Sequence, residues 1–145
     1  MSNDIKILTV LCTGHWQKEV VNKYYNILYK NWLSFVNENG GIGNRNINIK
    51  IVKIDRKETP NEFEKKILEQ KKLFNPDVYI HFNWAIKVNE NLVDSFLNDE
   101  CIVISDHKYT KNNKNYLYLS SPKNHNFIRN VHLLSKNLKK KNILI

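Results

Sequence analysis

Residues 35–54 read FVNENGGIGNRNINIKIVKI, and they hold a helix end, a glycine turn and a strand in direct succession. Glycine adopts the positive φ that a helix C-terminus often needs, so Gly40 and Gly41 predict that the helix stops there. The following residues alternate, with Ile47, Ile49 and Ile51 on one side and polar residues on the other. That period of two is typical of a strand near a sheet edge.

The rest of the chain continues this alternation of helices and strands. Residues 5–11 form a short apolar run typical of a buried strand, and 16–37 keep the apolar spacing of a long helix. Further on, the patterns predict strands over 78–82, 101–104, 116–119 and 142–145, and helices over 59–74, 89–98 and from 121 onward. Such an order predicts parallel pairing with right-handed crossovers and helices on both faces. We therefore expect an α/β three-layer sandwich with a mostly parallel, doubly wound sheet.

The composition indicates one folded domain and argues against two classes of partner. The 145 residues are 41% hydrophobic, which suffices for a core. The net charge of +9 rests on 23 basic residues, of which only Arg45, Arg56 and Arg129 are arginines. Arginine is the residue that binds phosphate through two hydrogen bonds at once. Because this chain is rich in lysine and poor in arginine, its sequence predicts a solvated basic surface and no nucleic-acid partner. No window approaches the roughly 20 apolar residues of a membrane span.

The two cysteines predict neither a disulfide framework nor a metal centre. Cys12 ends one predicted strand and Cys101 begins another, so a parallel sheet would hold them at opposite edges. The chain also lacks H-x-x-x-H and C-x-x-C spacings, a G-x-S-x-G elbow and a phosphate loop. We expect two buried thiols, no metal and no cofactor.

Six stretches, taken in order, resemble motifs of one known family. The strongest is FVNENGGIGNRNI at 35–47, which is similar to E-I-N-x-x-G-G-I-x-G-R-x-I. The others are LCTGHW (11–16), NPDVYI (75–80), IVIS (102–105), NYLYLSSP (115–122) and KKKNIL (139–144). Together they resemble the branched-chain amino-acid and amide-binding family of type I periplasmic binding proteins, the substrate-binding proteins of ABC transporters.

The resemblance implies one lobe of a two-lobed binding protein. Residues 1–121 would be the first ligand-binding lobe, and 122–145 a crossover helix and first strand toward a second lobe that is absent from this chain. It implies a small-molecule ligand, a role in amino-acid transport or as a sensor, and a second lobe, a second copy or a transporter as partner. The location would be periplasmic for a mature fragment and cytoplasmic for a chain complete as written.

Polar and aromatic residues follow three of the predicted strands. Ligands of open α/β sheets sit beyond the carboxyl ends of the strands, near the point where the strand order reverses. The ligand-binding candidates there are Thr13, His15, Trp16, Asn83, Trp84, Ala85, Ser105, Asp106 and His107. Each of these residues also has a structural interpretation. Trp16 and Trp84 could pack against helix ends, His15 and His107 could be exposed loop residues, and the Asp106 carboxylate could stabilise its own loop. We expect a structural role for His81.

One departure from the family bears on the ligand. The family has G-P-x-S-S after the third strand, where this chain has His81-Phe82-Asn83-Trp84-Ala85. The family's serines hold an amino acid's carboxylate, so their absence argues against an ordinary amino-acid ligand.

Two other classes of function stay open at this point. Without a second lobe, the aromatic loops would form an exposed patch, which favours a protein-interaction or dimerisation module. Asn83, Asp106 and His107 are residue types that perform acid–base work, as in transferases acting on sugar amines. Binding without chemistry is the main hypothesis.

Overall fold

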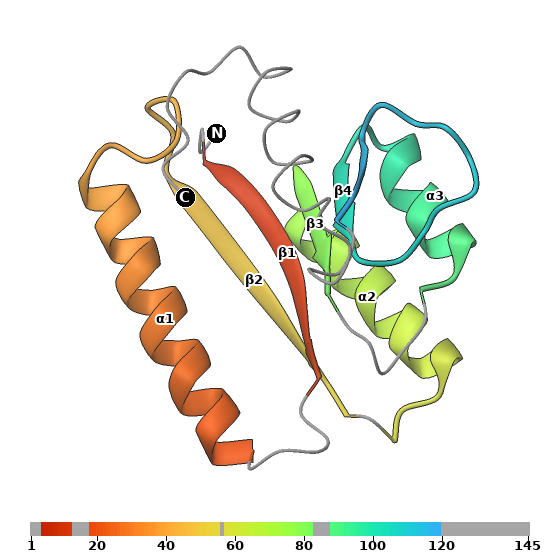
Figure 1. The fold of residues 1–145 in the computed structure, drawn as a ribbon, viewed down its shortest axis with the longest axis horizontal. Helices are drawn as coiled ribbons and strands as arrows, with labels where there is room; N and C mark the ends of the chain where they lie inside the picture. The colour runs from red at the N-terminus through yellow and green to blue at the C-terminus, as the bar shows by residue number, and fades with distance from the viewer. Residues whose placement is uncertain (1–3, 13–17, 56, 83–87, 120–145) are drawn as a thin grey trace.

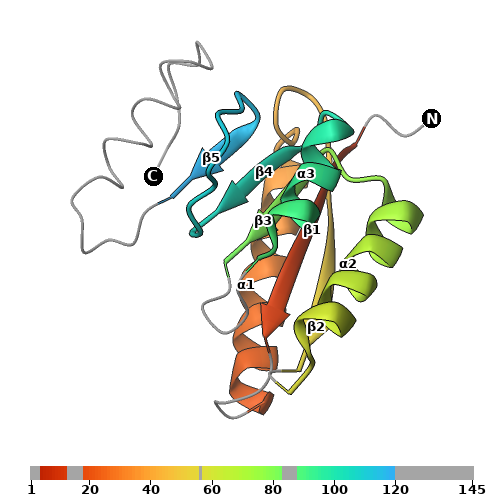
Figure 2. The same cartoon turned by 90° about the vertical axis from the view of Figure 1, so that its right-hand side faces the viewer.

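The strands form one parallel sheet in the order β2-β1-β3-β4-β5 (Figure 1 and Figure 2). The computed structural model describes residues 4–12, 18–55, 57–82 and 88–119. Within them the strands are β1 (Ile5–Cys12), β2 (Ile47–Ile54), β3 (Val78–His81), β4 (Ile102–Ser105) and β5 (Tyr116–Tyr118). The helices are α1 (Lys18–Glu38), α2 (Pro60–Phe74) and α3 (Glu90–Asn98). The predicted α/β fold is confirmed, and β2 is the expected edge strand.

The helices lie on opposite faces of this sheet, with α1 on one side and α2 and α3 on the other (Figure 2). The chain moves from β1 outward to β2, and then in the reverse direction to β3 and β4. Since crossovers are right-handed, this reversal places the connecting helices on opposite faces. The reversal, or switch point, falls between β1 and β3, whose carboxyl ends therefore flank the expected crevice.

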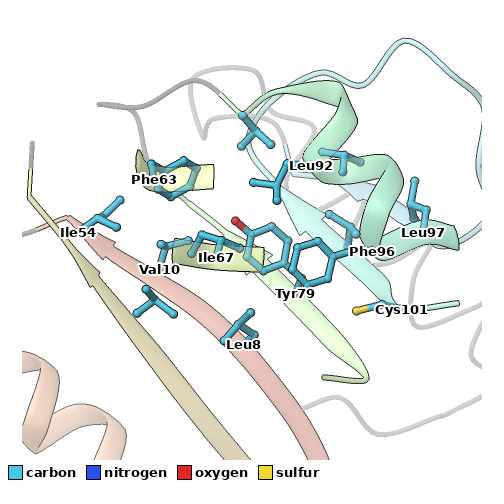
Figure 3. Packing of buried hydrophobic residues seen from close by; sticks show 14 residues of the cluster. Leu8, Val10, Ile54, Phe63, Ile67, Tyr79, Leu92, Phe96, Leu97 and Cys101 are labelled. Carbon is cyan, nitrogen blue, oxygen red and sulfur yellow. The ribbon is translucent and has the colours of Figure 1, made fainter. Parts of the chain in front are cut away.

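The hydrophobic core lies between the sheet and the α2/α3 layer (Figure 3). Tyr79 of β3 and Phe96 of α3 are both fully buried, and their rings stack at 4.1 Å with an interplanar angle of 5°. The other large members are Leu8, Val10, Val52, Ile54, Phe63, Ile67, Leu92, Leu97 and Val103. Strand members sit at alternate positions, as expected where side chains alternate between two faces.

The glycine stretch acts as predicted. Gly40, Gly41 and Gly43 have φ of 89°, 68° and 61°, values that side chains with a Cβ disfavour. Asn37, in the last turn of α1, exchanges two hydrogen bonds with the backbone of Ile47, at 3.0 and 2.8 Å. The end of the helix is thus tied to the first residue of β2.

The start of α2 also follows the sequence. Thr59 is the N-cap, and it forms a capping box with Glu62. The Glu62 carboxylate accepts hydrogen bonds from the backbone and hydroxyl of Thr59, which lower the pKa of Glu62. Pro60 occupies the first helical turn, and Asn75 closes the helix in the left-handed conformation.

The structure corrects several details. The apolar run predicted as a strand over 5–11 extends to Cys12 in β1, and Ser105, placed in a loop, is the last residue of β4. The alternation in β2 places Ile47, Ile49 and Ile51 on one side of the strand. Val52 and Ile54, on the other side, are also deeply buried. The predicted elements beyond residue 119 lie outside the described residues.

Two expectations about the cysteines and the membrane can be compared with the structure. Cys101 is buried directly before β4, so it lies at the opposite end of the sheet from Cys12, as predicted. Burial raises the pKa of the Cys101 thiol to about 12. None of the described helices is long and apolar enough to cross a membrane.

Candidate functional site

The nine predicted site residues fall into two groups. Thr13, His15, Trp16, Asn83, Trp84 and Ala85 lie outside the described residues and stay predictions. Ser105, Asp106 and His107 are described, and they sit together where β4 ends. The strands that lead to all three loops, β1, β3 and β4, are neighbours in the sheet. The carboxyl ends of these strands therefore share one edge.

Ser105 builds the turn that carries the next two residues. It is 1% exposed, and its hydroxyl accepts a hydrogen bond of 3.0 Å from the backbone N–H of His107. Its carbonyl accepts from the N–H of Leu119, at 2.8 Å, beside β5. The Tyr116 hydroxyl donates to the carbonyl of His107. This turn is therefore held from both β4 and β5.

Asp106 and His107 form a pair at the rim of this turn. His107 Nε2 lies 3.5 Å from Asp106 Oδ1, and the two side chains are 25% and 34% exposed. The Oδ1 atom itself is enclosed, yet among the described residues it has no hydrogen-bond donor. An enclosed carboxylate oxygen without a donor is costly, so this atom is a natural acceptor for a ligand.

His81 lies beneath this pair, at the end of β3. It is fully buried, and its Nδ1 is 3.0 Å from the Tyr79 hydroxyl. Its ring centroid is 5.3 Å from that of His107 and 5.7 Å from that of Phe63, which meets it edge-on. Burial raises the pKa of Tyr79 well above its usual range, so its hydroxyl stays protonated. The enclosure of His81 agrees with the expected structural role.

The connection from β4 to β5 is anchored on α3. Asp94 accepts hydrogen bonds from the Tyr109 hydroxyl and from Lys111, and these lower the pKa of Asp94. Thr110 donates to Glu90 at 2.7 Å. The Tyr109 ring packs against that of Tyr116 with centroids 4.8 Å apart. The loop after Asp106 and His107 is thus fixed at several points along its length.

Sequence reasoning did not single out Phe82, Tyr116 or Tyr118 for this edge. Phe82 follows β3 directly, Tyr118 ends β5, and both side chains are close to half exposed. The sequence predicts Phe82 as the last residue of the strand over 78–82, whereas β3 ends at His81; an aromatic residue at a strand end was the available signal. Tyr116 begins β5, at the far end from the carboxyl edge, and only the three-dimensional structure shows its hydroxyl reaching His107.

The other candidates for a site are a groove on α2 and a metal centre. A shallow, open groove runs along α2, and its lining residues Asn61, Glu64, Lys65, Leu68, Glu69, Lys71 and Lys72 all belong to that one helix. It is a solvated helix surface and does not include the polar cluster at β4. Among the described residues, no three metal-binding side chains converge.

Comparisons with known proteins found likeness among solved structures alone. No protein-family model matches the sequence, and neither does any curated protein. The similar solved structures include a substrate-binding periplasmic protein from Ralstonia solanacearum and an ABC-type branched-chain amino acid transporter from Rhodopseudomonas palustris. Identities are 16% and 13%, TM-scores 0.47 and 0.48, and 69% and 81% of this chain is covered.

This chain spans only 28% and 32% of the lengths of those two proteins. At such identities and TM-scores, the likeness says nothing about a ligand or an activity. The α/β architecture is established by the parallel sheet and its two helix layers directly.

Proposed function

We propose that this chain binds a small polar molecule at the carboxyl edge of its sheet, as a solute-binding or sensor lobe does. The observation that carries the proposal is the enclosed Oδ1 of Asp106, which has no hydrogen-bond donor among the described residues. A bound ligand with an ammonium, amide or hydroxyl group would supply that donor, and a hydrogen bond to a charged acceptor is among the stronger ones.

The position of this atom supports the proposal. Asp106 directly follows β4, which pairs with β3 beside the switch point between β1 and β3. In open α/β sheets this is where ligands bind. The predicted loops at 13–16 and 83–85 leave the same edge from β1 and β3.

The residues around Asp106 suit recognition of a compact, partly apolar molecule. Phe82 and Tyr118 offer half-exposed aromatic surface at the ends of β3 and β5, and Trp16 and Trp84 are the predicted walls. His107 adds an imidazole beside the carboxylate. Aromatic walls with a few placed polar groups are the usual make-up of a small-ligand site. The ligand class we propose is a small amine or polyhydroxy compound.

The transport role is part of this proposal and rests on a second lobe. Residues 1–121 would form one wall of the cleft, and a second lobe would close over the ligand by a hinge motion. The names of the two similar structures, a substrate-binding periplasmic protein and an amino acid transporter, fit such a role without carrying it.

The test is a thermal-shift screen of the full chain against sugars, polyols, amines and amino acids. A ligand should raise the melting temperature in a concentration-dependent way. Asp106→Asn should then weaken binding about 10- to 100-fold, the equivalent of one hydrogen bond to a charged group. Glu69→Gln, which removes the same charge from the exposed surface of α2, should leave binding unchanged.

Three results would count against the proposal. If none of the compounds stabilises the chain, or if Asp106→Asn binds as tightly as the parent, the Asp106 site is not a ligand site. If a compound is instead turned over, with loss of turnover in both Asp106→Asn and His107→Gln, the enzyme alternative replaces binding.

A further inference from the structure

The core cluster lies on one side of the sheet, and Ile47, which is 3% exposed, is the buried apolar strand residue on the other side among the described residues. Every strand residue in the core cluster points toward α2 and α3. The strand register defines a second set of residues on the opposite face, in two rows across the sheet. One row is Ile49, Ile7, Val78 and Ile102, and the other is Ile51, Thr9, Ile80, Ile104 and Leu117. We name these two rows the α1-side face.

This face is apolar but incompletely covered. Of its nine residues, Thr9 alone is buried, at 5% exposed, whereas Ile102 is 39% exposed and the others are half-buried. The helix on this side, α1, lies alongside β2 at the edge of the sheet and away from β3 and β4 (Figure 1). Two of its own apolar side chains, Trp32 and Phe35, are 48% and 66% exposed.

Such a face needs a cover. Parallel sheets are found almost only with both faces packed, and their strands are apolar on both sides for that reason. Among the described residues the α2/α3 layer supplies the cover on one face, and α1 supplies a part of it on the other. The open part lies over β3, β4 and β5, and the next segment of the chain starts beside it.

That segment is residues 120–145. Leu119, the last described residue, is held by a hydrogen bond from its N–H to the carbonyl of Ser105, at 2.8 Å. The segment therefore leaves from the edge of the sheet at β5. Its sequence places Phe127, Val131, Leu134 and Leu138 at spacings of four, three and four, which is one stripe of a helix. Arg129 and Lys136 fall on the opposite side of that helix.

The direction of the chain selects the face. A helix that returns from β5 toward β1 moves in the same direction across the sheet as α1 does between β1 and β2. For a connection that returns to a parallel strand of this sheet, the right-handed rule places the helix on the same face as α1. Its length also fits, because residues 122–138 would span about 25 Å as a helix. Five strands extend over about 19 Å.

We propose that residues 122–138 form an amphipathic helix that packs its Phe127/Val131/Leu134/Leu138 stripe across the α1-side face, over β3 and β4. The segment then completes the cover of the first lobe. The proposal does not depend on the ligand site, because Asp106 lies at the carboxyl edge and the stripe contacts the face.

The test is thiol labelling of the full chain in a Cys12→Ser background with Ile104→Cys as reporter. Ile104 lies in the middle of the α1-side face, whereas Cys101 is buried near the core cluster on the opposite side and reports loss of the fold as a whole. The Ile104→Cys thiol should react at least about tenfold more slowly than in unfolded chain, since labelling requires the covering helix to open.

Two matched substitutions then separate the faces of the proposed helix. Leu134→Asn should speed labelling of the Ile104→Cys thiol while Cys101 stays protected, and it should lower the melting temperature by about 5–10 °C. Lys136→Asn, the same new residue on the polar side, should change neither. Rapid labelling in the parent would overturn the proposal, and so would equal effects of the two substitutions. Protection that disappears on dilution would show that a second copy covers the face instead.

Discussion

The contact between His81 and Tyr79 makes a quantitative prediction about the floor of the site. Both side chains are fully buried, and the hydroxyl lies 3.0 Å from Nδ1. His81→Leu keeps an apolar side chain of similar size but removes the partner of the Tyr79 hydroxyl. Leaving a buried hydroxyl without that partner costs about 1–3 kcal/mol. In Tyr79→Phe/His81→Leu both polar groups are gone, so most of that penalty disappears.

The free energy of unfolding in urea measures this coupling. The double variant should be more stable than the sum of the single effects predicts, by about 1–2 kcal/mol. With a urea m value of about 2 kcal/mol/M, this is a midpoint difference of about 0.5–1 M. Tyr109→Phe combined with His81→Leu is the control, because the Tyr109 hydroxyl bonds to Asp94, and its effects should add. Additivity of the His81 and Tyr79 variants within about 0.5 kcal/mol would refute the reasoning.

Three further predictions concern local structure. A Cβ at Gly41 would lie 1.9 Å from a backbone oxygen, so Gly41→Ala should cost more than about 1 kcal/mol in urea unfolding. Gly40→Ala, with nothing within 4 Å, should cost less. Thr59→Ala should cost about 1 kcal/mol, and Thr59→Ser should restore most of it. Hydrogen bonds from Lys111 and Tyr109 lower the pKa of Asp94 below 3.8, so its stabilisation is present above that pH and lost as pH falls through the lowered pKa. Asp94→Asn should therefore flatten the acid limb of the stability–pH curve, and an unchanged limb would contradict this.

Much of the fold was predictable because its signals are local. The apolar spacing, the glycines of 39–44 and the alternation after Ile47 each act within one element, and the structure follows them closely. The clamp between Asn37 and Ile47 was not predictable, because an asparagine near a helix end has many local partners. Element ends moved by one residue at Cys12 and Ser105, where no proline or glycine marks the strand end.

The place of Asp106 and His107 in the fold was predictable, but the contacts that support them were not. Asp106 and His107 were selected because they follow a strand, and this rule places them at the carboxyl edge. The contact of His107 with His81 depends on the parallel register of β3 and β4, which pairs His81 with Ser105. Residues 26 apart in the sequence meet through that register, and no local pattern specifies it.

The anchoring of the β4–β5 connection explains how an acceptor without a donor can persist at Asp106. Ser105 and Tyr116 hold the turn from the sheet, and Asp94 holds the rest of the loop from α3 through Tyr109. These contacts fix the backbone from which the Asp106 side chain extends. In the ligand-free protein, the stability of the fold offsets the free-energy cost of enclosing Asp106 Oδ1 without a hydrogen-bond donor from the described residues. A ligand that donates to Oδ1 then meets a carboxylate that is already placed, so its binding energy is not spent on ordering this loop.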